Sequence, residues 1–416
     1  MVSPSTFARR SAAAGAIVGL LYLPPPRLVA SQKGVESPAM RFIFSALLLV
    51  VLFPSLLRAQ TKPDKEYFVY VLSEAADKIS LVRFGPEGIR VDHEIGTGDM
   101  PVDIDGPHGI VVSPDRQFYF VSIAHGRPFG TVWKYSTKDD AVLGKTTLGY
   151  FPATMDITPD GNFLFVVNFN LHGDMVPSSV SVVSTQTMTE IARITTCTMP
   201  HGSRLNAQGT QQYSACMMDD MLVEIDTSTL KASRHFMVTK GREKGLDGPP
   251  TKDVTSSSTH SMHAGHGSQA PKPGDVSCSP TWAEPSGASI FVACNASSEI
   301  VEVNANTWTL VRRIPARSGV YNLDVTHDGR RLIATNKRDQ SVSIYDLKSG
   351  SELARVPTKR KVLHGVVVSP DDRYAFVTVE GIGSEPGTVE VIDLAALKTV
   401  ATLDVPAGAA GIDFFK

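Results

Sequence analysis

The chain has 416 residues, a formal charge of −2 and 42% hydrophobic residues, an ordinary composition for a globular protein with a large core. Without a basic excess there is nothing to neutralise phosphates, so nucleic acid is not expected as a partner. The many glycines (33) and prolines (27) favour short strands separated by turns.

The N-terminal segment has the layout of a secretory signal. Arg41 provides a positive start, an apolar run extends to Leu57, and the small residue Ala59 stands at the cleavage position. Pro54 interrupts the run, which is too short for a membrane span. The mature protein is therefore expected to be exported to the periplasm or the extracellular space, without a transmembrane span.

Residues 1–59 are accordingly predicted to be removed. Residues 40–59 would form the signal peptide and residues 1–39 an over-long translation start. A twin-arginine signal at Arg9-Arg10 is the alternative, although the usual aromatic residue and lysine do not follow it.

The remaining chain, residues 60–416, repeats one pattern seven times. Each repeat has a short inner strand, a turn, a β-rich second strand, a loop and two further strands. Most repeats start 40–48 residues apart, the length of a four-stranded propeller blade. The inner strands with their turns fall at 107–115, 152–161, 200–209, 279–287, 320–329, 363–372 and 406–416.

The seventh inner strand ends the chain, so its three partners must come from the front. Segments 67–72, 78–84 and 90–96 have the required alternation. Pairing the two ends in one blade closes the ring and removes free sheet edges. The sequence therefore predicts an all-β, seven-bladed β-propeller as a single domain, with no partner needed for stability and hence a monomer.

An insertion at 242–276 lies between the third and fourth repeats. It is rich in Ser, Thr, Gly and Pro, which predicts a flexible loop. It carries His260, Met262, His263 and His266. Imidazole with thioether in an exported protein favours a transition metal, copper above zinc. The alternative is a loop with incidental metal affinity.

Three inner strands begin with histidine in register: His108, His201 and His364. Counting back from the turn gives Ala153, Ser279, Tyr321 and Ala407 at the same position of the other repeats. His125 and His172 occupy loops predicted on the same face. Five acidic residues predicted there could serve as bases or ligands: Asp103, Asp105, Asp174, Glu380 and Glu385. Propeller topology places the starts of all inner strands at the mouth of the central channel. This face is therefore the predicted site for a metal, a small molecule or a protein ligand, with Tyr321 beside the histidines.

The four cysteines are predicted to form disulfides. Cys216 and Cys294 end second strands, and Cys197 and Cys278 lie at the starts of the inner strands of the same blades. Antiparallel neighbours bring these positions together, which favours Cys197–Cys216 and Cys278–Cys294 in an oxidising compartment. Other pairings, or a thiolate metal site, remain alternatives.

The repeats, with turns such as SPD in 107–115 and TPDG in 152–161, resemble the YVTN or YncE-like family of propellers. They are more loosely similar to cytochrome d1-type and lactonase-type propellers. The resemblance implies the fold and leaves the function open, because propellers host many activities. No C-x-x-C-H motif appears, so no covalent c-type haem is expected. Three functions follow: a ligand-, metal- or protein-binding propeller, a copper-type oxidoreductase, or a lactonase- or lyase-like enzyme that uses the channel-mouth histidines.

Overall fold

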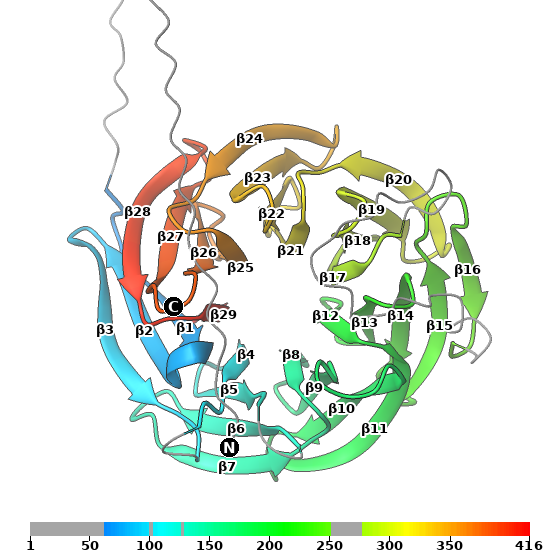
Figure 1. Cartoon of the computed structure of the whole chain (residues 1–416), viewed down its shortest axis with the longest axis horizontal. Coiled ribbons are helices and arrows are strands. Elements are labelled where there is room, and N and C mark those ends of the chain that lie inside the picture. The colour runs from blue at the N-terminus through cyan, green and yellow to red at the C-terminus, as the bar shows by residue number, and fades with distance from the viewer. Residues whose placement is uncertain (1–61, 100–102, 126–128, 251–276) are drawn as a thin grey trace, which may run out of the picture. The chain divides into compact units, whose positions relative to one another are not determined.

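The computed structural model describes residues 62–99, 103–125, 129–250 and 277–416, which form seven antiparallel sheets arranged in a ring (Figure 1). A single 3-10 turn, η1 (Glu74–Ala76), interrupts the strands. No helix in these ranges is long and apolar enough to span a membrane. The predicted all-β, seven-bladed propeller is confirmed. The predicted signal at 1–59 lies outside the described residues.

Each sheet is one blade, whose innermost strand lines the channel and whose later strands lie progressively further out. Blade one has β4 (Pro107–Val112), β5 (Phe118–Ile123), β6 (Thr131–Ser136) and β7 (Val142–Thr147). Blade two has β8 (Pro152–Ile157), β9 (Phe163–Asn168), β10 (Pro177–Ser184) and β11 (Thr189–Thr198). Blade three has β12 (Pro200–Leu205), β13 (Gln211–Cys216), β14 (Met221–Asp226), β15 (Lys231–Met237) and β16 (Lys244–Asp247).

The remaining blades follow the same plan. Blade four has β17 (Pro280–Ser286), β18 (Ser289–Cys294), β19 (Glu299–Asn304) and β20 (Thr309–Pro315). Blade five has β21 (Val320–Val325), β22 (Arg331–Asn336), β23 (Ser341–Asp346) and β24 (Ser351–Pro357). Blade six has β25 (Val362–Val368), β26 (Tyr374–Glu380), β27 (Gly387–Asp393) and β28 (Lys398–Val405). Blade seven has β29 (Ala409–Phe414), β1 (Tyr67–Ser73), β2 (Lys78–Gly85) and β3 (Gly88–Gly96).

Blade seven joins the two ends of the chain, as predicted. The C-terminal β29 pairs antiparallel with β1, with Val69 opposite Phe414 and Val71 opposite Ile412. In Figure 1 the red strand β29 lies inside the blue strand β1. The pairing completes the ring.

The core consists of side chains packed between neighbouring blades rather than one central cluster. Between blades six and seven, for example, the rings of Tyr67 and Tyr374 meet edge to face at 5.2 Å, as do those of Phe84 and Tyr374. Burying an aromatic side chain of this size contributes about 2–3 kcal/mol. The blades are therefore fixed face to face, and their inner strands have defined positions around the channel.

Both predicted disulfides, Cys197–Cys216 and Cys278–Cys294, are present. Cys197 lies in β11, the outer strand of blade two, so its bond to Cys216 at the end of β13 joins blades two and three. Cys278 lies two residues before β17, and its bond to Cys294 at the end of β18 lies within blade four. The predicted loop insertion, 242–276, begins differently from expectation, since β16 pairs with β15 as a fifth strand of blade three. Residues 251–276, including His260, Met262, His263 and His266, lie outside the described residues.

Candidate functional site at the channel mouth

The starts of the seven inner strands form a ring around the channel, which we call the histidine ring. In each blade the position follows the last pair before the register shift between the inner strand and the second strand. Its members, in blade order, are His108, Ala153, His201, Thr281, Tyr321, His364 and Ala410. The predicted Ser279 and Ala407 are therefore wrong. In blade four the turn residue Ser286 is itself part of the strand, and in blade seven no turn follows from which to count.

A glycine follows the histidine in all three His blades, and the packing explains it. A Cβ added at Gly109 would lie 1.9 Å from the carbonyl oxygen of Ala153, and one at Gly202 would lie 2.4 Å from that of Thr281. The next blade's ring position approaches so closely that no side chain fits. The His-Gly pairs thus set how closely the blades meet at the mouth.

Four members of the histidine ring form a closed quartet of rings, which we call the aromatic quartet. Neighbouring ring centroids are 6.4 Å apart for His108 and His201, and 5.3 Å for His201 and Tyr321. They are 5.3 Å apart for Tyr321 and His364, and 5.1 Å for His364 and His108. The three histidines are only 2–7% exposed. The predicted convergence of His108, His201, His364 and Tyr321 is therefore present.

His201 is fixed as a neutral imidazole. Its Nδ1–H donates to the carbonyl oxygen of Thr281 at 2.9 Å, so Nε2 accepts the hydroxyl hydrogen of Tyr321 at 3.0 Å. Burial lowers the pKa of His201 to about 3, and also lowers that of His364 well below its usual range. These two rings therefore bring no charge into the quartet at neutral pH.

His108 differs because it is bound to a carboxylate. Its Nδ1 lies 2.9 Å from Oε2 of Glu74, and Nε2 of His125 lies 2.7 Å from Oε1 of the same group. Burial opposes ionisation of Glu74, but attraction to His108 and hydrogen bonds from both histidines outweigh it and lower its pKa. The hydrogen bond to Glu74 raises the pKa of His125. Since the carboxylate accepts both bonds, Nε2 of His108 is left over, and it is buried without a protein partner.

A second ring, which we call the mouth ring, is formed by the residue after the second strand of each blade. In five blades its N–H donates to the carbonyl of the residue just before the inner strand, at 2.8–3.1 Å. Asn295 makes the same bond to Ser279 at 3.3 Å, and Glu380 ends β26 opposite Val362. In order from blade one, the ring reads Ala124, Phe169, Met217, Asn295, Lys337, Glu380 and Glu74.

The mouth ring is divided into an apolar and a charged half. Blades one to three supply Ala124, Phe169 and Met217, which pack in one hydrophobic cluster with Phe151 and Met199. Blades four to seven supply the polar and charged side chains. A molecule seated on the quartet therefore meets apolar surface on one side and ionisable groups on the other.

Lys337 is the cation of this charged half. Its Nζ lies 3.6 Å from the centroid of the Tyr321 ring. Burial lowers its pKa to about 8, although Glu380 and Glu74 act in the opposite direction. Burial also raises the pKa of Glu380, against the attraction of Lys337. Clustered groups with perturbed pKa values in a concave site are typical of function.

Backbone strain accompanies the apolar half. The residue before each inner strand is left-handed in six blades, and glycine supplies it in three of them. Phe151, Met199 and Ser279 supply it in the others, with φ of 50°, 53° and 45°. A non-glycine residue there costs about 1 kcal/mol. Phe151 offsets that cost with contacts to His108 and His125, at centroid distances of 5.3 and 5.0 Å.

Several nitrogens of the predicted metal set have protein partners. Both nitrogens of His201 are used by Thr281 and Tyr321, and Nδ1 of His108 is used by Glu74. In the described part of the chain, no three His, Cys, Asp or Glu side chains are grouped as metal ligands. Metal binding at His108, His201 and His364 therefore stays a prediction. His172 lies 5.8 Å from His125, ring to ring, at the exposed edge of the site.

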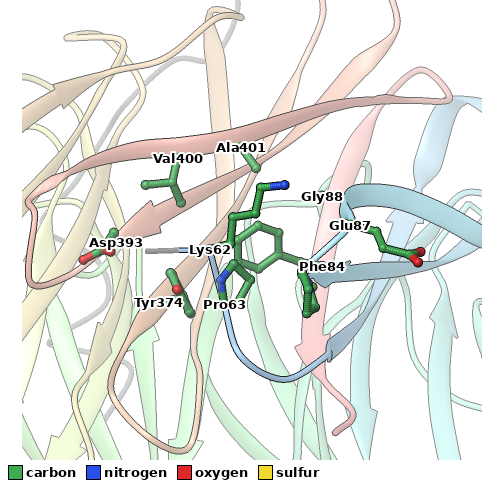
Figure 2. A pocket seen from close by; sticks show the side chains of 11 residues that line it. Lys62, Pro63, Phe84, Glu87, Gly88, Tyr374, Asp393, Val400 and Ala401 are labelled. Atoms are coloured by element: carbon green, nitrogen blue, oxygen red, sulfur yellow. The ribbon is translucent and has the colours of Figure 1, made fainter. Parts of the chain in front are cut away.

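Two cavities bear on the location of the ligand site. A small cavity of about 30 Å³ lies in the channel beneath the quartet, lined by His108, His364 and Asn322 among others. A larger one of about 300 Å³ opens on the rim between blades six and seven (Figure 2). There Phe84 and Tyr374 form an apolar wall beside Lys62, and no histidine lines it. The acid–base groups thus gather at the channel mouth.

Glu74 and Lys337 were not expected from the sequence. Each follows a second strand directly, and Glu380 is the last residue of one, so an alignment of the repeats on the ends of these strands would have revealed the mouth ring. The inner strands, from which the site was predicted, do not contain the residues of the mouth ring.

Comparison with known proteins supports the fold. No protein-family model and no curated protein matches the sequence. Hydrazine synthase from Kuenenia stuttgartiensis matches at 19% identity and a TM-score of 0.56, over 76% of this chain and 92% of that one. A protein of unknown function from Desulfotomaculum acetoxidans matches at 14% and 0.59, over 83% and 98%. A candidate 6-phosphogluconolactonase from Bacteroides fragilis matches at 13% and 0.59, over 85% and 99%. At these identities the likeness extends to the seven-bladed propeller alone.

Proposed function

We propose that this chain is an exported propeller of the YVTN type that binds a small polar organic molecule at the channel mouth, with His108 as its acid–base group. One observation carries the proposal: the Glu74–His108 pair, whose distal Nε2 is buried without a protein partner. A buried nitrogen without a hydrogen bond lowers the free energy of unfolding by about 1–3 kcal/mol, which favours a functional role for it. A ligand hydroxyl that enters the quartet would supply the missing partner.

The two disulfides support export, because such bonds persist in oxidising compartments. The carboxylate orients the imidazole through Nδ1 and leaves Nε2 unpaired. This is the arrangement in which histidine acts as a general base.

The proposal is tested with protein labelled with ¹⁵N in histidine. D-glucono-δ-lactone, gluconate, lactate and pyruvate are titrated in turn, and the imidazole nitrogens are followed by NMR. At least one probe is expected to shift Nε2 of His108 and to raise the thermal midpoint. His108→Gln should remove the effect, whereas His93→Gln, on the exposed outer strand β3, should keep it. An unchanged His108 resonance with all four probes would overturn the proposal.

Hydrolysis of a lactone is the second candidate function. It is favoured by the same Glu74–His108 pair, with Nε2 taking a proton from the attacking water, and it agrees with the name of the Bacteroides fragilis neighbour. Release of acid from D-glucono-δ-lactone should exceed the spontaneous rate and fall about 100-fold in His108→Gln. Equal rates with and without protein would exclude it.

A further inference from the structure

Lys337 differs from two other lysines that lie over aromatic rings and are also paired. The ammonium groups of Lys134 and Lys145 lie 3.8 and 3.4 Å from the centroids of Phe118 and Trp133. Lys134 also donates to the carbonyl of Thr185, and Lys145 to Asp99. Among the described residues, Nζ of Lys337 lies over the face of Tyr321 but donates to no hydrogen-bond acceptor and joins no ion pair.

The position of this amine is as distinctive as its lack of partners. Lys337 stands in the mouth ring between Asn295 and Glu380, next to the aromatic quartet. The residue is half-buried, and its Nζ lies over Tyr321, which belongs to the same quartet as His108 with its unpaired Nε2. A lysine in such a poorly solvated place loses part of its preference for the charged form, and the neutral amine is a nucleophile.

We propose that Lys337 forms a reversible imine with small uncharged carbonyl compounds that carry an apolar substituent. The inference rests on the proposed ligand site at the channel mouth but on a different residue of it. It names the class of ligand: aldehydes and ketones rather than acids.

The chemistry balances with groups already at the mouth. The neutral Nζ attacks the carbonyl carbon, a C–N bond forms, and the π pair moves to oxygen. Glu380, whose raised pKa keeps its carboxyl protonated to higher pH, donates a proton to that oxygen and then takes one from nitrogen. A second proton from Glu380 releases the hydroxyl as water and forms the protonated C=N bond, whose N–H proton then returns to Glu380 to give the neutral imine. The sum is one carbonyl compound and one amine converted to one imine and one water, with no oxidant or reductant.

The two halves of the mouth ring select the substituent. Glu74 is ionised and lies two blades from Lys337, so the carboxylate of a 2-oxo acid would be repelled. Phe169 and Met217, on the opposite side, give an aromatic or alkyl group a surface to pack against. Benzaldehyde represents the preferred class, and glyoxylate an aldehyde of the disfavoured one.

Reductive trapping tests the proposal. The full-length protein is incubated with substoichiometric benzaldehyde and cyanoborohydride, and the modified lysine is located by peptide mass mapping. Labelling of Lys337 is expected to be about tenfold faster than that of Lys240, an exposed lysine paired with Glu299. Its rate should rise with pH through a midpoint near 8. Glyoxylate should label Lys337 more slowly than benzaldehyde does.

Controls keep this outcome apart from that of the proposed function. Lys337→Arg retains the charge without the nucleophile and should abolish the fast adduct, while Lys240→Arg should leave it unchanged. Labelling in proportion to exposure, or an unchanged fast adduct in Lys337→Arg, would overturn the imine. Loss of ligand response at His108 with retained labelling would remove the proposed function and leave the imine standing.

Discussion

Two levels of the channel contain buried ionisable groups, and they use them differently. At the mouth, Nε2 of His108 and Nζ of Lys337 have no hydrogen-bond partner among the described residues. Three residues further along the inner strands lies what we call the acidic belt: Asp156, Arg204, Glu284, Asp324 and Asp413. There the carboxylates are hydrogen-bonded within the protein.

The belt carboxylates join neighbouring blades. Asp156 accepts the N–H of Leu205 at 2.8 Å, Asp324 that of Val368 at 2.7 Å, and Asp413 that of Val112 at 2.7 Å. Each partner lies on the inner strand of the next blade. Burial raises the pKa of all three, as it does at the mouth for Glu380. Both levels therefore contain groups with shifted pKa values. They differ because the groups of the belt are hydrogen-bonded, whereas the mouth has groups that lack hydrogen-bond partners.

Removing the cation from the belt tests this difference with the largest expected effect. Arg204 faces the belt carboxylates, 3.8 Å from Glu284 and 4.6 Å from the Trp282 ring centroid. Arg204→Met should lower the free energy of unfolding by about 3 kcal/mol, because it leaves buried carboxylates uncompensated. Urea denaturation measures it. Arg193→Met, which breaks an exposed pair with Glu190, is the control and should cost less than about 1 kcal/mol. Equal losses would mean that the belt is not structural.

Replacing the cation of the mouth, Lys337, by methionine should raise the free energy of unfolding instead of lowering it. Lys337 is charged below its folded pKa of about 8 and is penalised by burial. Its pKa in the unfolded chain is near 10.4, so wild-type stability should rise as pH increases from about 8 to 10.4. Lys337→Met should raise the free energy of unfolding by about 1–2 kcal/mol at pH 7 and abolish this rise. Destabilisation at pH 7 would show that the ammonium is structurally satisfied.

A neutral isostere in the belt gives a smaller, pH-dependent effect. Burial, and then the charge of Asp324, raise the pKa of Glu284 in the folded protein. A carboxyl with a raised folded pKa loses stability as pH rises from its unfolded value, near 4.3, toward the folded one. The free energy of unfolding of Glu284→Gln, relative to that of wild type, should therefore increase by about 1 kcal/mol between pH 5 and pH 8. The Gln can still accept the bond from Trp282 Nε1. A pH-independent difference would contradict the raised pKa.

The strained positions give the smallest effect. Ser279→Gly should stabilise the fold by about 0.5–1 kcal/mol, because glycine adopts the left-handed backbone without cost. Phe151→Gly relieves the same strain but removes a buried ring from the mouth and should destabilise. Thermal denaturation of both variants compares them. A gain at Phe151 as well would show that its side chain contributes nothing there.

The sequence predicts the ring, its closure and the disulfides because these depend on local alternation and spacing. His108, His201 and His364 could be placed together because a Pro-His-Gly or Leu-His-Gly start recurs in register. The partners of these histidines could not be assigned. Glu74 lies 34 residues before His108 and in another blade, so only the closed ring brings them within 2.9 Å.

The predicted register of the inner strand is wrong in the two blades, four and seven, that lack the usual turn after this strand. β17 runs on to Ser286, so the count from the turn reached Ser279 instead of Thr281. Similarly, the insertion's composition predicts a loop, yet Gly245 packs against Trp308, where an added Cβ would lie 2.5 Å from its ring. That close contact, invisible in composition, accompanies the pairing of β16 with the edge of blade three.

The pairing of β1 with β29 makes closure of the ring depend on two segments that are far apart in the sequence. β29 (Ala409–Phe414) covers the inner edge of the blade whose other strands, β1 to β3, come from Tyr67–Gly96. A chain that lacks β29 would keep six sheets whole but expose β1 as an unpaired edge and uncover Tyr70, whose ring lies 5.4 Å from that of Phe415. Truncated copies would therefore expose an unpaired β-strand edge, a feature that proteases and chaperones recognise.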